Sequence, residues 1–138
     1  MPPIGPGRTR LFDPYARDVG RMGETDDLDD AYRFRTPSLR NVTLTAPYGH
    51  NGAYPDLRGI IAHHLDAPGG LDRWQKEMAH LPEAPWLKTV DFVVLDDKRE
   101  MARLRSRVDI QPVSLQDEEV DDLIAFLHAL EGSGAARP

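Results

Sequence analysis

Apolar residues recur at helical spacing in several parts of this chain, and the clearest is the segment 116–131. Its apolar positions form one stripe along a helix, and the glycine that follows is a common helix stop. The stripe consists of Val120, Leu123, Ile124, Leu127 and Leu130. The same spacing predicts helices over 56–65, 71–79 and 98–107.

The segments between these helices are rich in residues that interrupt regular structure. The chain contains 12 prolines and 11 glycines, so we expect short helices joined by long irregular loops. Pro68-Gly69-Gly70 is expected to end the first of the helices, and the last residues, 133–138, are expected to be a disordered tail. The predicted fold class is therefore all-α.

Composition excludes several kinds of partner and site. With 138 residues the chain is long enough for one domain with its own core. The net charge of −6 argues against nucleic acid as a partner, because phosphate binding needs clustered Lys and Arg. No stretch has the length of a membrane span, and the first residues lack the pattern of a signal peptide. The absence of cysteine excludes disulfides and thiolate metal sites within these residues.

Histidine is the remaining ligand type for a transition metal. His63 and His64 are adjacent, so on a helix they point about 100° apart and cannot easily share one ion. His64 shares the helix face of Leu57, Ile60 and Ile61, whereas His63 lies off that face. Periodicity therefore allows His64 to be either a buried core histidine or a ligand, and the first is the more common outcome.

A third candidate lies in a loop rather than on a helix. His50 belongs to the run Tyr48-Gly49-His50-Asn51-Gly52, whose glycines and polar side chains are typical of binding loops. A tight turn with a hydrogen-bonded histidine explains the run equally well. The residues alone thus predict a helical domain with a possible site centred on histidine.

The segment Phe34–Gly52, read FRTPSLRNVTLTAPYGHNG, closely resembles the C-terminal haem domain of MauG-like and bacterial dihaem cytochrome c peroxidases. The resemblance extends over 3–66 and returns over 115–131, where the final helix looks like the last helix of a cytochrome c fold. It implies that residues 1–132 form an incomplete cytochrome c-like domain that lacks the haem-attachment segment.

In that family the haem c is attached through a Cys-x-x-Cys-His sequence, which the resemblance places before Met1. The family's distal iron ligand lies seventeen residues after the proline that matches Pro47, and that count reaches His64. The resemblance thus implies that His64 is the distal axial ligand of the haem iron. The neighbouring His63 remains an alternative.

The resemblance also implies contacts for other residues of the segment. Thr45 and Pro47 match positions whose backbone carbonyls bind calcium in the family, and oxygen ligands of this kind suit a hard cation. Arg40 and Asn41 are expected to contact the haem propionates, because guanidinium pairs well with carboxylate. His50 is expected to contribute to coupling between the two haem domains.

The function implied by the resemblance is that of an electron-transfer haem lobe in a peroxidase or MauG-like oxidoreductase that uses hydrogen peroxide. Its expected partners are the missing N-terminal haem domain and either a small electron-donor protein or a protein substrate. As part of a full-length protein of this family it would be periplasmic. The alternative is a haem-free, degenerate fragment or a non-enzymatic interaction domain, and this chain alone is not expected to be active.

Overall fold

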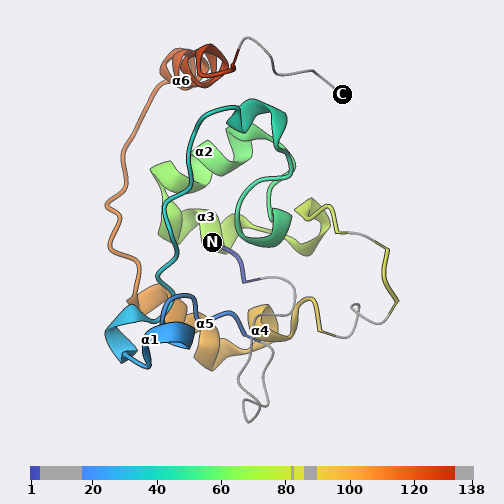
Figure 1. Ribbon diagram of the computed structural model, residues 1–138, viewed down its shortest axis with the longest axis vertical. Coiled ribbons are helices and arrows are strands. Elements are labelled where there is room, and N and C mark those ends of the chain that lie inside the picture. Colours follow the sequence, from blue (N-terminus) through green and yellow to red (C-terminus); the bar gives the residue numbers. More distant parts are fainter. Residues whose placement is uncertain (4–16, 82, 86–89, 133–138) are drawn as a thin grey trace. The chain divides into compact units, whose positions relative to one another are not determined.

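The computed structural model describes residues 1–3, 17–81, 83–85 and 90–132, and over these residues all regular structure is helical (Figure 1). They form six α-helices and four short 3-10 helices, with no β-strand. The prediction of an all-α fold is confirmed. The expected disordered tail, 133–138, lies outside the described residues.

The chain divides into two compact units. Among the described residues, unit 1 contains Met1, residues 36–80 and residues 110–132, and unit 2 contains those that fall within 2–35 and 81–109. The helices of unit 1 are η2 (Val42–Leu44), η3 (His50–Gly52), α2 (Leu57–Leu65), α3 (Ala67–Arg73), η4 (Lys76–Met78) and α6 (Asp117–Ala129). Those of unit 2 are α1 (Met22–Thr25), η1 (Leu28–Asp30), α4 (Val93–Asp96) and α5 (Lys98–Ser106).

The helices predicted over 56–65 and 98–107 are present as α2 and α5. Each begins after an aspartate whose carboxylate accepts a hydrogen bond from a free backbone N–H of the first turn. The Asp56 carboxylate accepts from the N–H of Gly59 at 2.7 Å, and that of Asp97 accepts from Arg99 at 2.8 Å. Apolar spacing and capping agree here, which explains why the sequence predicted both helices well.

The helix predicted over 71–79 is wrong in its position. Helix α3 already begins at Ala67, and Pro68-Gly69-Gly70 forms its first turn instead of separating two helices. Asp66 accounts for this, because its side chain accepts a hydrogen bond from Gly69 N at 3.0 Å and so caps the new helix. Proline fits a first turn, where its missing N–H has no partner to lose.

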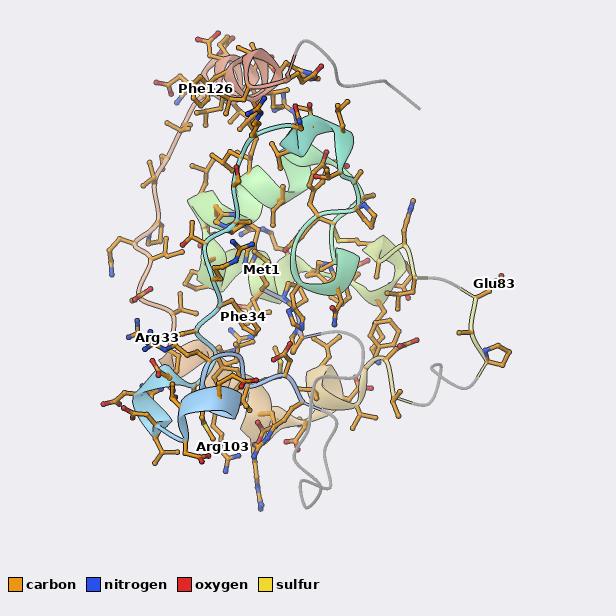
Figure 2. All side chains as sticks on the ribbon, in the orientation of Figure 1. Met1, Arg33, Phe34, Glu83, Arg103 and Phe126 are labelled. Carbon is orange, nitrogen blue, oxygen red and sulfur yellow. The ribbon has the colours of Figure 1, made fainter. Side chains whose placement is uncertain are left out.

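Helix α6 packs against α2 and η2 within unit 1, and α2 lies between α6 and α3 (Figure 1). Val120 is buried on it at 8% exposure, and Arg58 of α2 forms an ion pair with Asp121. The predicted stripe is only partly a core, because Leu123 is 38% exposed and Phe126 is 55% exposed (Figure 2). The described residues thus leave one apolar side of α6 without cover.

The core of unit 2 includes a buried carboxylate. Glu100 of α5 is 4% exposed, and it accepts hydrogen bonds from the Tyr32 hydroxyl and from Arg17, both at 2.7 Å. Arg103 also pairs with it. Burial by itself would raise the pKa of Glu100, but the hydrogen bonds from Tyr32 and Arg17 outweigh it and hold the pKa below its ordinary value. Glu100 thus ties α5 to the segment that precedes residue 36.

We predict that Glu100→Gln lowers the unfolding free energy by about 1–3 kcal/mol at neutral pH, because Arg17 and Arg103 lose a buried charge partner. Since the folded pKa is depressed, this stabilisation is present above the ordinary carboxyl pKa and is lost as the pH falls through the folded value. Urea unfolding at several pH values should show that the unfolding free energies of the wild type and Glu100→Gln become equal in acid. The exposed Glu83→Gln serves as the control, and a gap of constant size at all pH values would contradict the prediction.

Helices α2 and α3 approach each other closely at Gly70. A Cβ atom added at this position would lie 2.8 Å from Nδ1 and 3.2 Å from Cα of His63. Both distances are shorter than an ordinary van der Waals contact, so a methyl group at position 70 does not fit unless His63 shifts. The pair of helices therefore depends on glycine at position 70.

We predict that Gly70→Ala destabilises the chain by about 1–3 kcal/mol, as overpacking does in other cores. Alanine in place of a helical glycine normally stabilises a helix by about 1 kcal/mol. A loss of stability in Gly70→Ala would therefore point to the close contact with His63. Thermal unfolding measures the effect, and Gly23→Ala in α1 is the matched control. Its nearest side-chain atom beyond its neighbours is Val19 Cγ2 at 3.8 Å, so it should not destabilise.

Candidate functional site

The structure places the two adjacent histidines of α2 in opposite environments. His63 is 4% exposed, whereas His64 is exposed. Of the two interpretations that periodicity left open for His64, that of a buried core histidine is therefore wrong. The reason is that His63 packs against Tyr54 and Gly70, which the helical spacing of α2 does not reveal.

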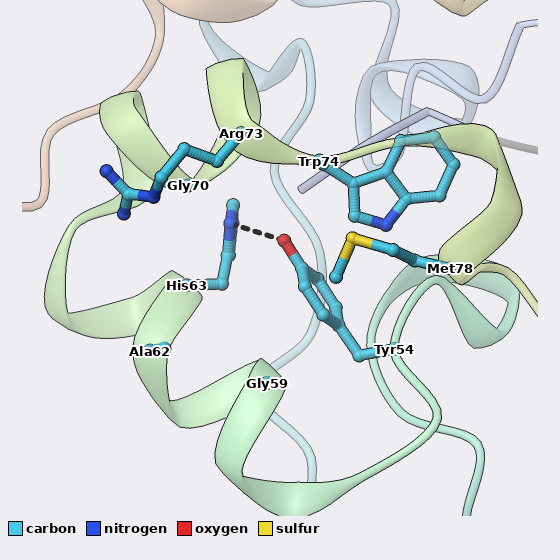
Figure 3. Close-up of a pocket in the computed structure, with 8 residues that line it drawn as sticks. All are labelled: Tyr54, Gly59, Ala62, His63, Gly70, Arg73, Trp74 and Met78. Carbon is cyan, nitrogen blue, oxygen red and sulfur yellow. Dashed lines mark hydrogen bonds between the residues drawn. The ribbon is translucent and has the colours of Figure 1, made fainter.

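His63 is held by its neighbours in unit 1. Its Nδ1 and the Tyr54 hydroxyl are joined by a buried hydrogen bond of 3.0 Å, and the two rings lie 5.4 Å apart. Both side chains line a small cavity of about 130 Å³, beside Trp74 and Met78 (Figure 3). Burial lowers the pKa of His63 to about 4, so its imidazole is neutral at physiological pH.

His64 is exposed, and its tautomer is determined by one hydrogen bond. Nδ1 lies 2.8 Å from the carbonyl oxygen of Ile60. Because a carbonyl can only accept, Nδ1 carries the proton and Nε2 is left with its lone pair. A backbone carbonyl bonded to one ring nitrogen is a frequent arrangement when the other nitrogen binds a metal.

The face of α2 around His64 is apolar and incompletely covered. Leu57, Ile60 and Ile61 share this face by their spacing, and all three are only partly buried in the structure. An exposed imidazole in line with half-exposed aliphatic side chains makes a surface that a flat, mostly apolar cofactor could cover. The chemistry of this face therefore fits a haem.

The loop that precedes α2 is closed by backbone pairing. Tyr48 and Tyr54 exchange both backbone hydrogen bonds, at 2.7 and 2.9 Å, and enclose residues 49–53. Gly49 has φ +80° at the start of this loop, a conformation that glycine adopts without strain. The Trp74 indole N–H donates to the carbonyl of Ala53 at 2.8 Å and so fixes the loop to the end of α3.

His50 lies in this loop, within η3, and it is half-buried. Its Nε2 is 3.4 Å from the side-chain nitrogen of Asn51. A role for His50 in coupling two haem domains stays a prediction.

Asn41 is used in a structural contact with the end of α6. Its side-chain oxygen accepts a hydrogen bond from Gly132 N at 2.7 Å, and its own N–H donates to the carbonyl of Leu130 at 3.3 Å. The residue adopts φ +59°, in the left-handed region. Arg40, next to it, is exposed. Contacts of Arg40 and Asn41 with haem propionates stay a prediction.

Thr45 and Pro47 lie in an exposed segment on either side of Ala46, and the Ala46–Pro47 peptide bond is cis. The hydroxyl of Thr45 donates to the carbonyl of Val42 at 2.9 Å. Across the ranges that the structure describes, no group of three or more His, Asp or Glu side chains could hold a metal ion. Calcium binding by the backbone carbonyls of Thr45 and Pro47 stays a prediction.

Sequence reasoning missed Tyr54, Gly70 and Trp74, which together hold His63 and the loop. Tyr54 had one usable signal, because it ends the glycine-containing loop just before the capping aspartate of α2. Gly70 and Trp74 had no such signal, because their contacts are with residues of other segments, which helical spacing cannot predict.

Within the described residues, every helix is too short or too polar to span a membrane.

Comparison with known proteins gives a consistent set of relatives. The chain is 32% identical to the cytochrome c peroxidase Ccp of Escherichia coli over 85% of its own length, and 36% identical to the methylamine utilization protein MauG of Paracoccus denitrificans over 76%. It is 34% identical to the cytochrome-c peroxidase IdrP1 of Denitromonas iodatirespirans over 83%. These matches cover 16%, 24% and 22% of the relatives' own lengths, so the chain spans less than a quarter of each.

No family model matches the chain. No solved structure matches it either.

The contacts of Asn41 predict how two substitutions differ. Asn41→Gly removes the hydrogen bond to Gly132 but tolerates the left-handed backbone, so it should cost about 1 kcal/mol. Asn41→Ala also puts in the left-handed region a residue that adopts it less readily than asparagine or glycine, so it should cost about 2 kcal/mol in total. Urea unfolding of both variants measures the difference. Equal stability of the wild type and both variants would show that the α6 contact does not hold this segment.

Proposed function

Because this chain belongs to the family of MauG-like and bacterial dihaem cytochrome c peroxidases, we propose that it forms the electron-transfer haem lobe of such an oxidoreductase, with His64 as an axial ligand of the iron. The lobe corresponds to the C-terminal haem domain of the family. The parent protein would use hydrogen peroxide as its oxidant. The proposal concerns a chain that spans a small part of its relatives, so the peroxide chemistry is assigned to the longer protein.

One observation carries the assignment of the ligand. His64 is exposed, and its Nδ1–H is bonded to the Ile60 carbonyl, so in the neutral ring the lone pair is on Nε2. His63 offers no such nitrogen on the surface, because its ring is buried against Tyr54. Of the two histidines, His64 combines exposure with an Nδ1 that is bonded to a carbonyl, and these features support its assignment as the iron ligand.

The residues of this chain can contribute coordination and packing, but not covalent attachment. Haem c is attached through cysteine thioethers, and none of the 138 residues is cysteine. Leu57, Ile60 and Ile61 would pack against the macrocycle beside His64. Arg40 would pair with a propionate, since its side chain is exposed and charged.

Bound haem supplies a reversible one-electron couple at its iron. Imidazole ligation gives that couple a lower potential than methionine ligation. His64 would therefore make this a low-potential site suited to passing electrons, and the Ile60 carbonyl would keep the ring oriented.

The proposal includes the setting of the longer protein. An N-terminal haem domain would be the intramolecular partner, and a small electron-donor protein or a protein substrate the external one. The location would be the periplasm. A calcium ion held by the carbonyls of Thr45 and Pro47 would order the segment between the two haem domains.

The alternative function is that of a haem-free interaction domain. Leu123 and Phe126 favour it, because their exposure leaves an apolar side on α6 that a partner protein could cover. Haem binding separates the two proposals.

We predict that the purified chain binds added hemin and that, after reduction under carbon monoxide, the optical spectrum is that of a six-coordinate haem with histidine opposite the carbon monoxide. In His64→Ala that spectrum should change to that of a haem without a histidine ligand, with hemin affinity reduced about tenfold or more, because the axial ligand from the chain is lost. His80→Ala is the matched control, since His80 is also an exposed histidine of unit 1 and has no assigned role. Identical spectra for the wild type and His64→Ala would remove the ligand assignment. A complete lack of hemin binding would favour the interaction domain.

A further inference from the structure

The geometry points to Tyr54 as a positioning residue that selects the ligand: it keeps His63 out of the coordination role and leaves His64 as the imidazole that binds iron. This inference rests on the proposed function, because it explains how one of two adjacent histidines is chosen.

The two imidazoles are equivalent as ligands, so the choice must come from what each already contacts. Their rings lie 5.9 Å apart at an interplanar angle of 87°. Consecutive side chains on a helix point about 100° apart, so a rotation of α2 about its axis would exchange their positions. Whatever sets that rotation decides which histidine points outward.

His63 is fixed from two sides by groups outside its own helix. The Tyr54 hydroxyl is bonded to Nδ1 at 3.0 Å on one side, and Gly70 of α3 leaves no space for even a methyl group on the other. Figure 3 shows the Tyr54 and His63 side chains pointing toward each other across the cavity. The His63 ring therefore cannot turn outward while Tyr54 holds it.

His64, in contrast, makes its hydrogen bond in the described structure within its own helix. Its bond to the Ile60 carbonyl turns the ring about its own side-chain bonds, but it cannot set the rotation of α2 as a whole. That rotation comes from contacts to other elements. One of these contacts is the buried Tyr54–His63 bond, which fixes the residue directly before His64.

Tyr54 is itself well placed to act as a fixed point. It is 3% exposed, and both its backbone N–H and its carbonyl are paired with Tyr48. Asp56, two residues later, caps α2. The loop Tyr48–Tyr54 thus ends just before the N-terminus of α2, and the Tyr54 side chain holds His63 two turns into the helix.

The first experiment needs no haem. Diethyl pyrocarbonate modifies accessible imidazole nitrogens, and fragmentation mass spectrometry distinguishes the adjacent His63 and His64. We expect His64 to be modified and His63 protected in the wild type. In Tyr54→Phe, which removes only the hydroxyl, modification of His63 should speed up about fivefold or more, as expected for the loss of one buried hydrogen bond.

Tyr48→Phe is the matched control, because Tyr48 is the other member of the same backbone pair and is also buried. Its His63 should stay protected. Circular dichroism establishes that each variant is folded. Protection of His63 in folded Tyr54→Phe would overturn the inference.

Gly70→Ala tests the same bond from the α3 side, because a Cβ at this position would lie 2.8 Å from His63 Nδ1 and would push that atom away from the Tyr54 hydroxyl. It should also raise the reactivity of His63. This variant keeps the inference open to test even where Tyr54→Phe does not fold.

The second experiment reads ligand choice directly with hemin as the probe. In the reduced carbon monoxide complex, His64→Ala should lack the spectrum of a histidine-ligated haem. Tyr54→Phe combined with His64→Ala should regain part of that spectrum, and adding His63→Ala should remove it again. A double variant that lacks the histidine-ligated spectrum as fully as His64→Ala would overturn the selecting role of Tyr54. A wild-type chain that gives no histidine-ligated spectrum would contradict the proposed haem function instead, and the modification experiment would still decide whether Tyr54 holds His63.

Discussion

The site depends on one buried contact, the hydrogen bond between the Tyr54 hydroxyl and Nδ1 of His63. It joins the loop closed by Tyr48 and Tyr54 to the middle of α2, and it lies where α3 approaches most closely at Gly70. A buried polar pair is costly unless both groups are satisfied, so each residue holds the other in place. The outward position of His64 follows from that constraint, because the two histidines are neighbours on one helix.

Local signals predicted most of the helices, and non-local contacts account for what was missed. Helices α2 and α5 combine apolar spacing with a capping aspartate, so both lines of reasoning agree. The start of α3 was misplaced because Pro68 and the two glycines after it are typical of a helix end. In the structure the cap by Asp66 makes them a first turn instead. The burial of His63 was missed for a related reason, since its bond to Tyr54 lies outside α2 and helical spacing does not reveal it.

The family relation adds chemistry that spacing could not supply. Without it, an exposed histidine beside half-buried aliphatic residues is an ordinary surface feature. With it, the same face of α2 becomes a surface that fits a haem. None of the 138 residues is cysteine, so under the proposal these residues would contribute coordination through His64 and packing through the aliphatic residues beside it.

The central claim is that His64, and not His63, presents a free Nε2 outward. Long-range ¹H–¹⁵N NMR correlation on the ¹⁵N-labelled chain at about pH 8, where an ordinary imidazole is neutral, reads the tautomer of each histidine directly. The structure predicts that His64 carries its proton on Nδ1, bonded to the Ile60 carbonyl, with Nε2 unprotonated. A proton on Nε2 of His64 would contradict the claim.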